Sequence, residues 1–106
     1  MNNGRFTVKW TPRALARLRV RQNWIEEQSG SAEIAAGWAE RILDTPEAQL
    51  PDFPYIGRVV PEFGRDDIRE LIVEGTTRIF YRVHDGRCDI LSVRRARELL
   101  GSLRAL

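Results

Sequence analysis

The sequence contains few of the residues on which small enzymes and secreted domains depend. Its 106 residues include one cysteine, one histidine and one lysine, namely Cys88, His84 and Lys9. A lone cysteine cannot close an internal disulfide, and Cys88 has no clustered histidine or acid that would make it a metal ligand or a nucleophile. We therefore expect neither a metal nor another cofactor.

Long apolar runs are also missing. No run approaches the roughly 20 residues that a membrane span requires, and the N-terminal residues MNNGRFTVKW lack the apolar segment of a signal peptide. We expect no membrane contact and a cytoplasmic location. A hydrophobic content of 42% is typical of a globular protein, and the length fits a single domain over residues 1–106.

Charge is abundant but unevenly distributed. Residues 1–25 carry six basic groups and no acidic one, residues 26–74 carry four basic and twelve acidic groups, and residues 75–106 carry seven and three. Almost all of the positive charge is arginine, whose planar fork binds carboxylate and phosphate and keeps its proton near neutral pH. Basic ends of this kind favour a polyanion or an acidic protein as the partner.

The N-terminal half predicts one short strand followed by two helices. Residues 5–10 alternate apolar and polar side chains, as a half-buried strand does. Thr11 and the proline after it form a helix start for residues 12–28, and Gly30 followed by Ser31 predicts a helix stop and a second N-cap. So short a connection makes the two helices an antiparallel hairpin.

The helical periodicity gives each helix an apolar face. Ala14, Leu15 and Leu18 belong to the core face of the first helix, and the opposite side carries four candidate contact residues: Arg13, Arg17, Val20 and Trp24. The apolar face of the second helix contains Ile34, Ala35, Trp38 and Ile42. Because proline removes a helical hydrogen bond, Pro46 predicts a break or kink at residues 44–45.

The C-terminal half predicts a sheet. After a loop that is rich in proline and glycine, with an edge strand at residues 57–60, the period of apolar residues changes to two. Three strands are expected at residues 68–73, 78–83 and 88–94, joined by Glu74-Gly75 and Asp85-Gly86, both of which are hairpin signals. We expect residues 96–106 to form a short helix or a tail over this sheet.

The expected hairpin register sorts the arginines by their neighbours. A two-residue loop at Asp85-Gly86 places Arg82 opposite Asp89, as an ion pair, whereas Arg78 has no acidic residue across the ladder. A similar loop at residues 74–75 adds Arg69 to the face that carries Arg78 and Arg95. These arginines form a candidate binding patch.

Several segments together resemble the RelE/ParE superfamily of toxins from type II toxin–antitoxin systems. They are KWTPRALARL, the loop FPYIGRVVPEFG, the strands IRELIV and RIFYRV, and DGRCDILSV with the trailing RRAR. The resemblance covers nearly the whole chain. It implies an α+β fold in which an N-terminal strand and a two-helix antiparallel hairpin pack on a small, mainly antiparallel sheet. It also implies a cognate antitoxin as partner.

The superfamily contains two kinds of toxin. Some are endonucleases that cut messenger RNA on the ribosome, and others are inhibitors of DNA gyrase. RNA cleavage requires groups that transfer protons, and this chain offers few: Tyr81 alternates with core residues, and His84 sits beside a turn, where we expect solvent around it. Ala96 and Ser102 stand where a match to RelE would place an arginine and a tyrosine. The helix start TPRA, the loop FPYIGRVVPE and the strands RELIV and RIFYRV also look closer to the ParE branch. The resemblance therefore favours a ParE-like gyrase inhibitor, and the shortage of proton-transfer groups agrees with it.

The resemblance and the pattern of residues together predict two sets of site residues. Arg69, Arg78, Arg95 and Arg97 are expected to bind the target, while Trp24, Val20, Arg13 and Arg17 are expected to bind the antitoxin. Two alternatives stay open. One is a RelE-like ribosome-dependent endonuclease, with Arg69, Arg78 and Arg95 at its site; the other is an attenuated toxin that only binds antitoxin, since Arg95 replaces a histidine common in ParE-like chains.

Overall fold

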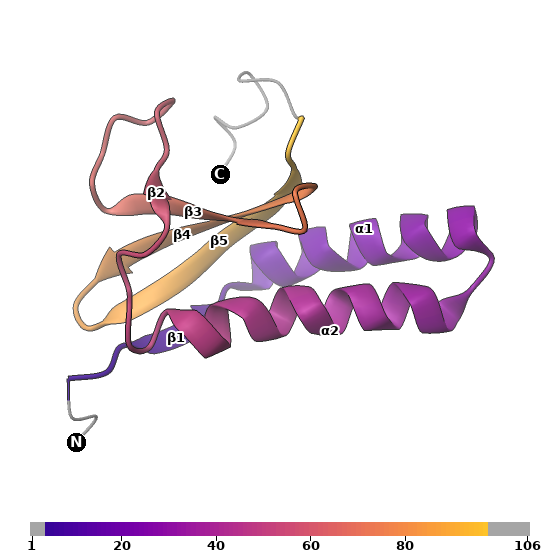
Figure 1. The fold of residues 1–106 in the computed structure, drawn as a ribbon, viewed down its shortest axis with the longest axis horizontal. Helices are drawn as coiled ribbons and strands as arrows, with labels where there is room; N and C mark the ends of the chain where they lie inside the picture. Colours follow the sequence, from indigo (N-terminus) through magenta and orange to yellow (C-terminus); the bar gives the residue numbers. More distant parts are fainter. Residues whose placement is uncertain (1–3, 98–106) are drawn as a thin grey trace.

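The predicted strand, helix pair and hairpins assemble into two layers, with both helices on one side of a single sheet (Figure 1). The computed structural model describes residues 4–97, so the prediction of a helix or tail at the C-terminus lies largely outside the described residues. The elements in chain order are β1 (Thr7–Trp10), α1 (Pro12–Ser29), α2 (Ala32–Gln49), β2 (Arg58–Val59), β3 (Ile68–Val73), β4 (Thr77–His84) and β5 (Arg87–Arg95).

The predicted helix boundaries are confirmed by the caps. The Thr11 side chain accepts a hydrogen bond from the Ala14 amide, and the Ser31 side chain accepts one from Ile34, so each satisfies an amide that the helix itself leaves open. Gly30 ends α1 with a left-handed backbone, at φ 69°, which costs glycine little. The two helices then run side by side in opposite directions (Figure 1).

The predicted break at residues 44–45 is wrong, because α2 continues through Pro46 to Gln49. Pro46 lies in the last turn of α2, and its missing N–H removes one helical hydrogen bond. Its carbonyl still accepts a bond from the Leu50 amide at 2.9 Å, and the residue is buried. Burial of an apolar ring near the helix end offsets part of what the missing bond costs.

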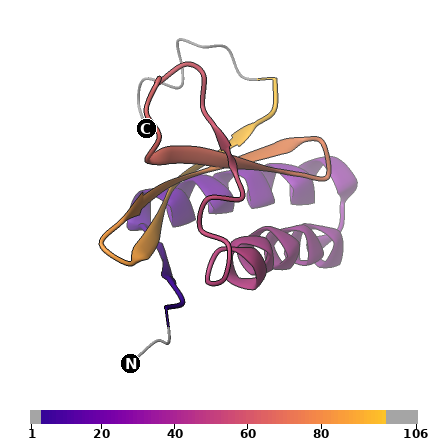
Figure 2. The same cartoon turned by 60° about the vertical axis from the view of Figure 1, so that its left-hand side comes forward.

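The sheet has the order β1-β5-β4-β3-β2. Only β1 and β5 pair in parallel, and the other neighbours are antiparallel, as expected of a mainly antiparallel sheet. Figure 2 shows both helices on the same face. The main core lies between the layers and includes Leu18, Trp38, Ile42, Leu71, Ile79, Tyr81, Val83, Cys88, Ile90 and Val93. Ile34 does not belong to it, since 58% of that residue is exposed at the start of α2.

The predicted register of the last hairpin holds only near its turn. Arg82 faces Asp89, as expected, but a β-bulge between Phe80 and Tyr81, with Leu91 as the extra residue on β5, shifts the pairs farther from the turn by one residue. Arg78 therefore faces Arg94, and Val93 moves to the face that the helices cover. A bulge of this kind reverses which side chains reach each face of the sheet beyond it.

The register of the preceding hairpin also differs. Val73 pairs with Thr77, so three residues rather than two form the turn. Arg69 consequently faces Tyr81, and Glu70 faces Phe80. On the face away from the helices a second cluster forms, in which Val60 and Phe63, which precede β3, pack with three residues of the sheet: Ile68, Phe80 and Leu91.

Among the described residues, neither helix combines the length and apolar character needed to cross a membrane.

Candidate functional site

Arg78, which we expected to be a free surface cation, is buried in an ion pair. Its Nε lies 2.5 Å from Oε1 of Glu70 and its Nη2 lies 3.1 Å from Oε2. The two side chains are 7% and 0% exposed. The hydrogen bond to Glu70 raises the pKa of Arg78 further above its ordinary value. Arg78 therefore stabilises the sheet and does not present its charge to a target.

Two more charged side chains complete this cluster. Arg58, on β2, reaches Oε2 of Glu70 at 2.7 Å, and Glu62 lies 3.3 Å from Nη2 of Arg78. The three-residue turn between β3 and β4 creates this arrangement, because it places Glu70 on the same face as Arg78. A two-residue turn would have placed Arg69 there instead, as we had expected.

Arg69 points to the opposite face and holds a loop. Its Nη1 donates to the carbonyl oxygens of Tyr55, at 3.2 Å, and Gly57, at 3.0 Å, while its Nε donates to Asp66 at 3.0 Å. Its guanidinium also lies 5.0 Å from the centre of the Tyr55 ring. The expected patch of Arg69, Arg78 and Arg95 is therefore not formed.

The remaining two predicted target-binding arginines lie near the end of β5. The bulge places Arg95 on the same side of the strand as Val93, which faces the helices. Arg97 follows in an exposed turn. Arg95 is thus separated from Arg78 by the sheet.

Arg95 instead lines a groove between α1 and the ends of β4 and β5. The groove has a volume of about 280 Å³ and is lined by Arg17, Val20, Arg21, Trp24, Thr77, Val93, Arg94 and Arg95. Three of the four residues predicted to bind antitoxin lie here, and Arg13 does not line it. The structure thereby joins parts of the two predicted sites.

The groove combines positive charge with apolar surface. Four of the lining residues belong to α1, namely Arg17, Val20, Arg21 and Trp24. They lie three, one and three positions apart, which places them on one face of the helix. Val20 and Trp24 are 70% and 45% exposed, and the Arg21 guanidinium stacks 4.1 Å from the centre of the Trp24 ring. Over residues 4–97, no aspartate or glutamate is among the lining side chains. Such a surface suits an acidic segment with apolar side chains.

Arg21 and Arg94 were missed by the sequence interpretation. The spacing of Arg21 from Arg17 and Trp24 along a helix is a signal that could have identified it. Arg94 offered none, because its position depends on the bulge. Its Nε donates to the Ser92 side chain at 2.9 Å, within the buried part of β5.

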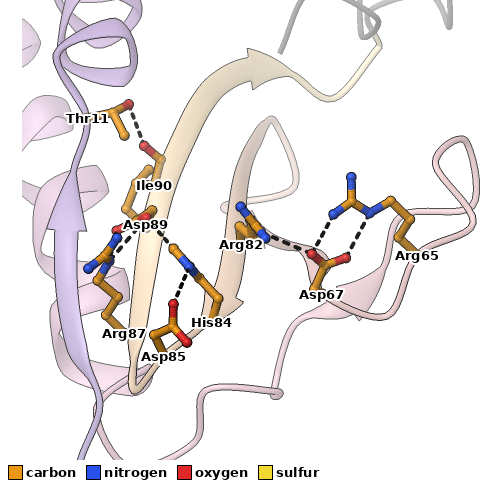
Figure 3. A network of polar contacts seen from close by, with 9 residues as sticks. All are labelled: Thr11, Arg65, Asp67, Arg82, His84, Asp85, Arg87, Asp89 and Ile90. Atoms are coloured by element: carbon orange, nitrogen blue, oxygen red, sulfur yellow. Dashed lines mark hydrogen bonds and ion pairs between the residues drawn. The ribbon is translucent and has the colours of Figure 1, made fainter.

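We had expected His84 to be a solvated turn residue, and this prediction is wrong. Nε2 of His84 lies 2.6 Å from Oδ2 of Asp89, and Nδ1 lies 3.4 Å from Asp85 (Figure 3). Burial alone would raise the pKa of Asp89, but the hydrogen bonds from His84 and Arg87 lower it. The two carboxylates fix the imidazole within the turn.

Arg82 also has an unexpected partner. It faces Asp89 across the ladder, but its Nε donates to Asp67 at 3.1 Å (Figure 3). Asp67 binds Arg65 as well, at 2.7 Å. The hydrogen bond from Arg65 is the main cause of the lowered pKa of Asp67. Asp89 therefore pairs with His84 and Arg87 and not with Arg82.

Tyr81 and Cys88 are both core residues. The sequence predicted this for Tyr81. The Tyr81 hydroxyl accepts a hydrogen bond from the Gly57 amide at 2.9 Å, and burial raises its pKa to about 12. Burial likewise raises the pKa of Cys88 to about 11, so this thiol is a poor nucleophile. Within the described part of the chain, no three histidine, cysteine or acidic residues are grouped as metal ligands.

Comparisons with known proteins agree with this architecture. The profile of the family described as "ParE toxin of type II toxin-antitoxin system, parDE" matches residues 8–100. A solved structure described as "Chromosomal ParDE TA system from P. aeruginosa" superposes with a TM-score of 0.71 at 23% identity, covering 87% of this chain and 97% of that one. No curated protein matches the sequence. Because the family profile spans most of the chain, the protein belongs to the ParE toxin family of type II toxin–antitoxin systems.

Proposed function

We propose that this toxin inhibits DNA gyrase in the bacterial cytoplasm and that its cognate antitoxin neutralises it by binding the groove between α1 and β5. Membership of the ParE family implies an antitoxin partner. The observation that carries the proposal for the groove is the combination of Arg17, Arg21 and Arg95 with the exposed Val20 and Trp24.

An acidic, amphipathic antitoxin segment fits this groove. Its carboxylates would pair with guanidinium groups such as that of Arg17, and its apolar side chains would cover Val20 and Trp24. Arg13 lies exposed one turn before Arg17 on α1 and would extend the contact along the helix. Such pairing gives specificity and fast association, while the apolar contacts supply most of the affinity.

The same groove suggests how binding suppresses toxicity. Arg95 is the predicted target-binding residue that lines it, and Arg97 follows two positions later. An antitoxin segment in the groove would cover Arg95 and compete with the target for it. Neutralisation then requires no change in the toxin's shape.

The environment of the ionisable groups supports binding rather than RNA cleavage. Cleavage needs an acid and a base beside the reacting phosphate. His84 is held between two aspartates, Tyr81 is buried with its pKa raised to about 12, and Arg78 is paired with Glu70. Arginine supplies the charge of the groove, and it does not transfer protons near neutral pH.

Expression of the toxin without antitoxin tests the target. We expect inhibition of gyrase supercoiling with the purified protein, and DNA breaks, filamentation and an SOS response in cells whose translation continues. Prompt translational arrest with cleavage of messenger RNA in register with codons would contradict gyrase inhibition and favour the endonuclease. Normal growth would favour the attenuated form.

A pair of arginines on α1 tests the groove. Arg17→Glu places a negative charge among the lining residues, whereas Arg19→Glu makes the same change at an exposed position that does not line the groove. We expect Arg17→Glu to weaken antitoxin binding by roughly tenfold or more, mainly through like-charge repulsion. Equal affinities of the two variants, measured by titration calorimetry, would exclude Arg17 from the interface.

A further inference from the structure

The loop of residues 51–57, between α2 and β2, carries an exposed apolar cluster. Phe53, Tyr55 and Ile56 are 63%, 54% and 55% exposed. Single exposed apolar residues are common on proteins, but three large ones within four positions are not explained by folding. They form a patch whose burial would be favourable.

The backbone of this loop is nevertheless fixed at both ends. The Pro51 carbonyl accepts a hydrogen bond from Phe6 at 2.8 Å, and Phe53 donates to Gln49 at 3.0 Å. At the other end Arg69 binds two carbonyls of the loop, as described above. Gly57 donates to the Tyr81 hydroxyl at 2.9 Å.

Gly57 makes this attachment specific to the sequence. A Cβ atom at this position would lie 2.5 Å from the Tyr81 hydroxyl and 2.7 Å from the Glu70 carbonyl oxygen, which is closer than a carbon atom packs against an oxygen. Only glycine allows the loop to lie so close to β3 and β4. The loop is therefore held in one shape while its apolar side chains face solvent, and a surface ordered in advance binds with a smaller entropic cost.

The arginines around the loop already have partners. Arg5 pairs with Asp52 at 2.9 Å and Arg58 pairs with Glu70 at 2.7 Å. Arg69 is occupied by carbonyl oxygens and the Tyr55 ring. A nucleic acid, or the acidic segment expected in the groove, would find little unpaired positive charge here. A folded protein with an apolar recess fits better, because such a recess receives exposed aromatic and aliphatic side chains.

We infer that the 51–57 loop is a second docking surface, which inserts Phe53 and Ile56 into an apolar recess of the toxin's folded protein target. The inference rests on the proposed function. The loop is separate from the groove: Figure 1 shows the segment between α2 and β2 at the left, whereas β5 ends at the right end of the sheet. An antitoxin bound in the groove would leave this loop uncovered.

Matched isoleucines test the inference. Ile56→Ser changes the loop, while Ile34→Ser makes the same change at a 58% exposed position at the start of α2. We expect Ile56→Ser, and likewise Phe53→Ser, to weaken binding to immobilised DNA gyrase by roughly thirtyfold and to relieve growth arrest. Ile34→Ser should behave as the unchanged protein does. Thermal melting should show that all three variants stay folded.

Three outcomes would decide the matter. If both loop variants bind gyrase and arrest growth as strongly as Ile34→Ser, the docking surface is excluded while gyrase inhibition stands. If the unchanged toxin does not bind gyrase but arrests growth, the proposed target is wrong, and relief of arrest by Ile56→Ser alone would still support the loop. Loss of rescue by the antitoxin in the loop variants would contradict the separation of the two surfaces.

Discussion

Arginines of similar appearance in the sequence have different roles in the structure. Arg78 neutralises a buried glutamate, Arg69 holds backbone carbonyls, and Arg17 lines the groove. The difference arises from the partners that the fold brings to each, because a guanidinium offers five donors and binds whatever acceptors surround it. Residue type alone therefore does not identify the binding surface.

The first prediction concerns the buried pair. Arg78→Ala removes the main partner of the Glu70 carboxylate, which stays buried. Only the half-exposed Arg58 then remains to pair with it. We expect a loss of about 3 to 5 kcal/mol in the free energy of unfolding, measured with urea, because an uncompensated buried charge is costly. The substitution would thus impair toxicity through the fold, contrary to the expectation from the sequence.

Two controls separate this cause from others. Arg82→Ala, on the same strand, removes an exposed pair with Asp67 and should leave the urea midpoint nearly unchanged. The double variant Arg78→Met with Glu70→Met removes both charges and should recover much of the stability. A single variant as stable as the unchanged protein would show that Glu70 does not depend on Arg78.

The second prediction concerns the thiol. Cys88 is fully buried and its pKa is raised to about 11, so little thiolate exists at pH 8 and reagents cannot reach it. We expect a chromogenic disulfide reagent to label Cys88 only as fast as the protein unfolds, with the rate increasing with urea. Rapid labelling of the native protein would contradict the burial of this strand.

Among the elements, the helix caps offer a direct comparison. The Thr11 hydroxyl caps α1 and also donates to the Ile90 carbonyl at 2.7 Å, which ties the helix start to β5. The Ser31 side chain only caps α2. Thr11→Ala should therefore cost about 1 to 2 kcal/mol of unfolding free energy, and more than Ser31→Ala, as urea titrations can measure. Equal losses would show that the bond to β5 adds nothing.

Elements were predictable where a local signal defined them. The caps at Thr11 and Gly30 and the three long strands follow from residue types and from periods of two or 3.6. The bulge between Phe80 and Tyr81 and the three-residue turn after Val73 carry no such signal, because they depend on which apolar residues the helices cover. Both errors shifted the register, and the predicted arginine patch was lost with them.

For the molecule as a whole, burial of Tyr81 and Cys88 predicts alkaline instability. Their pKa values rise from 10.0 to about 12 and from 9.0 to about 11. Folding favours the protonated forms, so the stability they contribute is complete below pH 9 and is lost as the pH rises towards 12. We expect the urea midpoint to fall over this range, and to fall less steeply in Cys88→Ala between pH 9 and 11. Parallel curves for the two proteins would exclude Cys88 as a cause.

At this scale the sequence predicted the layers and the family but only part of the site. Arg17, Val20 and Trp24 were found because they share one face of a helix. Only the bulge brings Arg95 into the same groove as these residues, and no pattern in residues 87–95 indicated the bulge. A site made by two elements far apart in the chain depends on register, which is the least local property of a sheet.

The parallel pairing of β1 with β5 has a consequence for the order of events during synthesis. Thr7 pairs with Arg87, and the groove joins α1 to Val93 and Arg95, so neither the first strand nor the groove is complete until the last strand has been translated. Until β5 has been made, β1 has no partner strand, although β3 and β4 can already pair. An antitoxin that binds the groove, as we propose, would find no complete site until then and would have to be present when the finished chain is released.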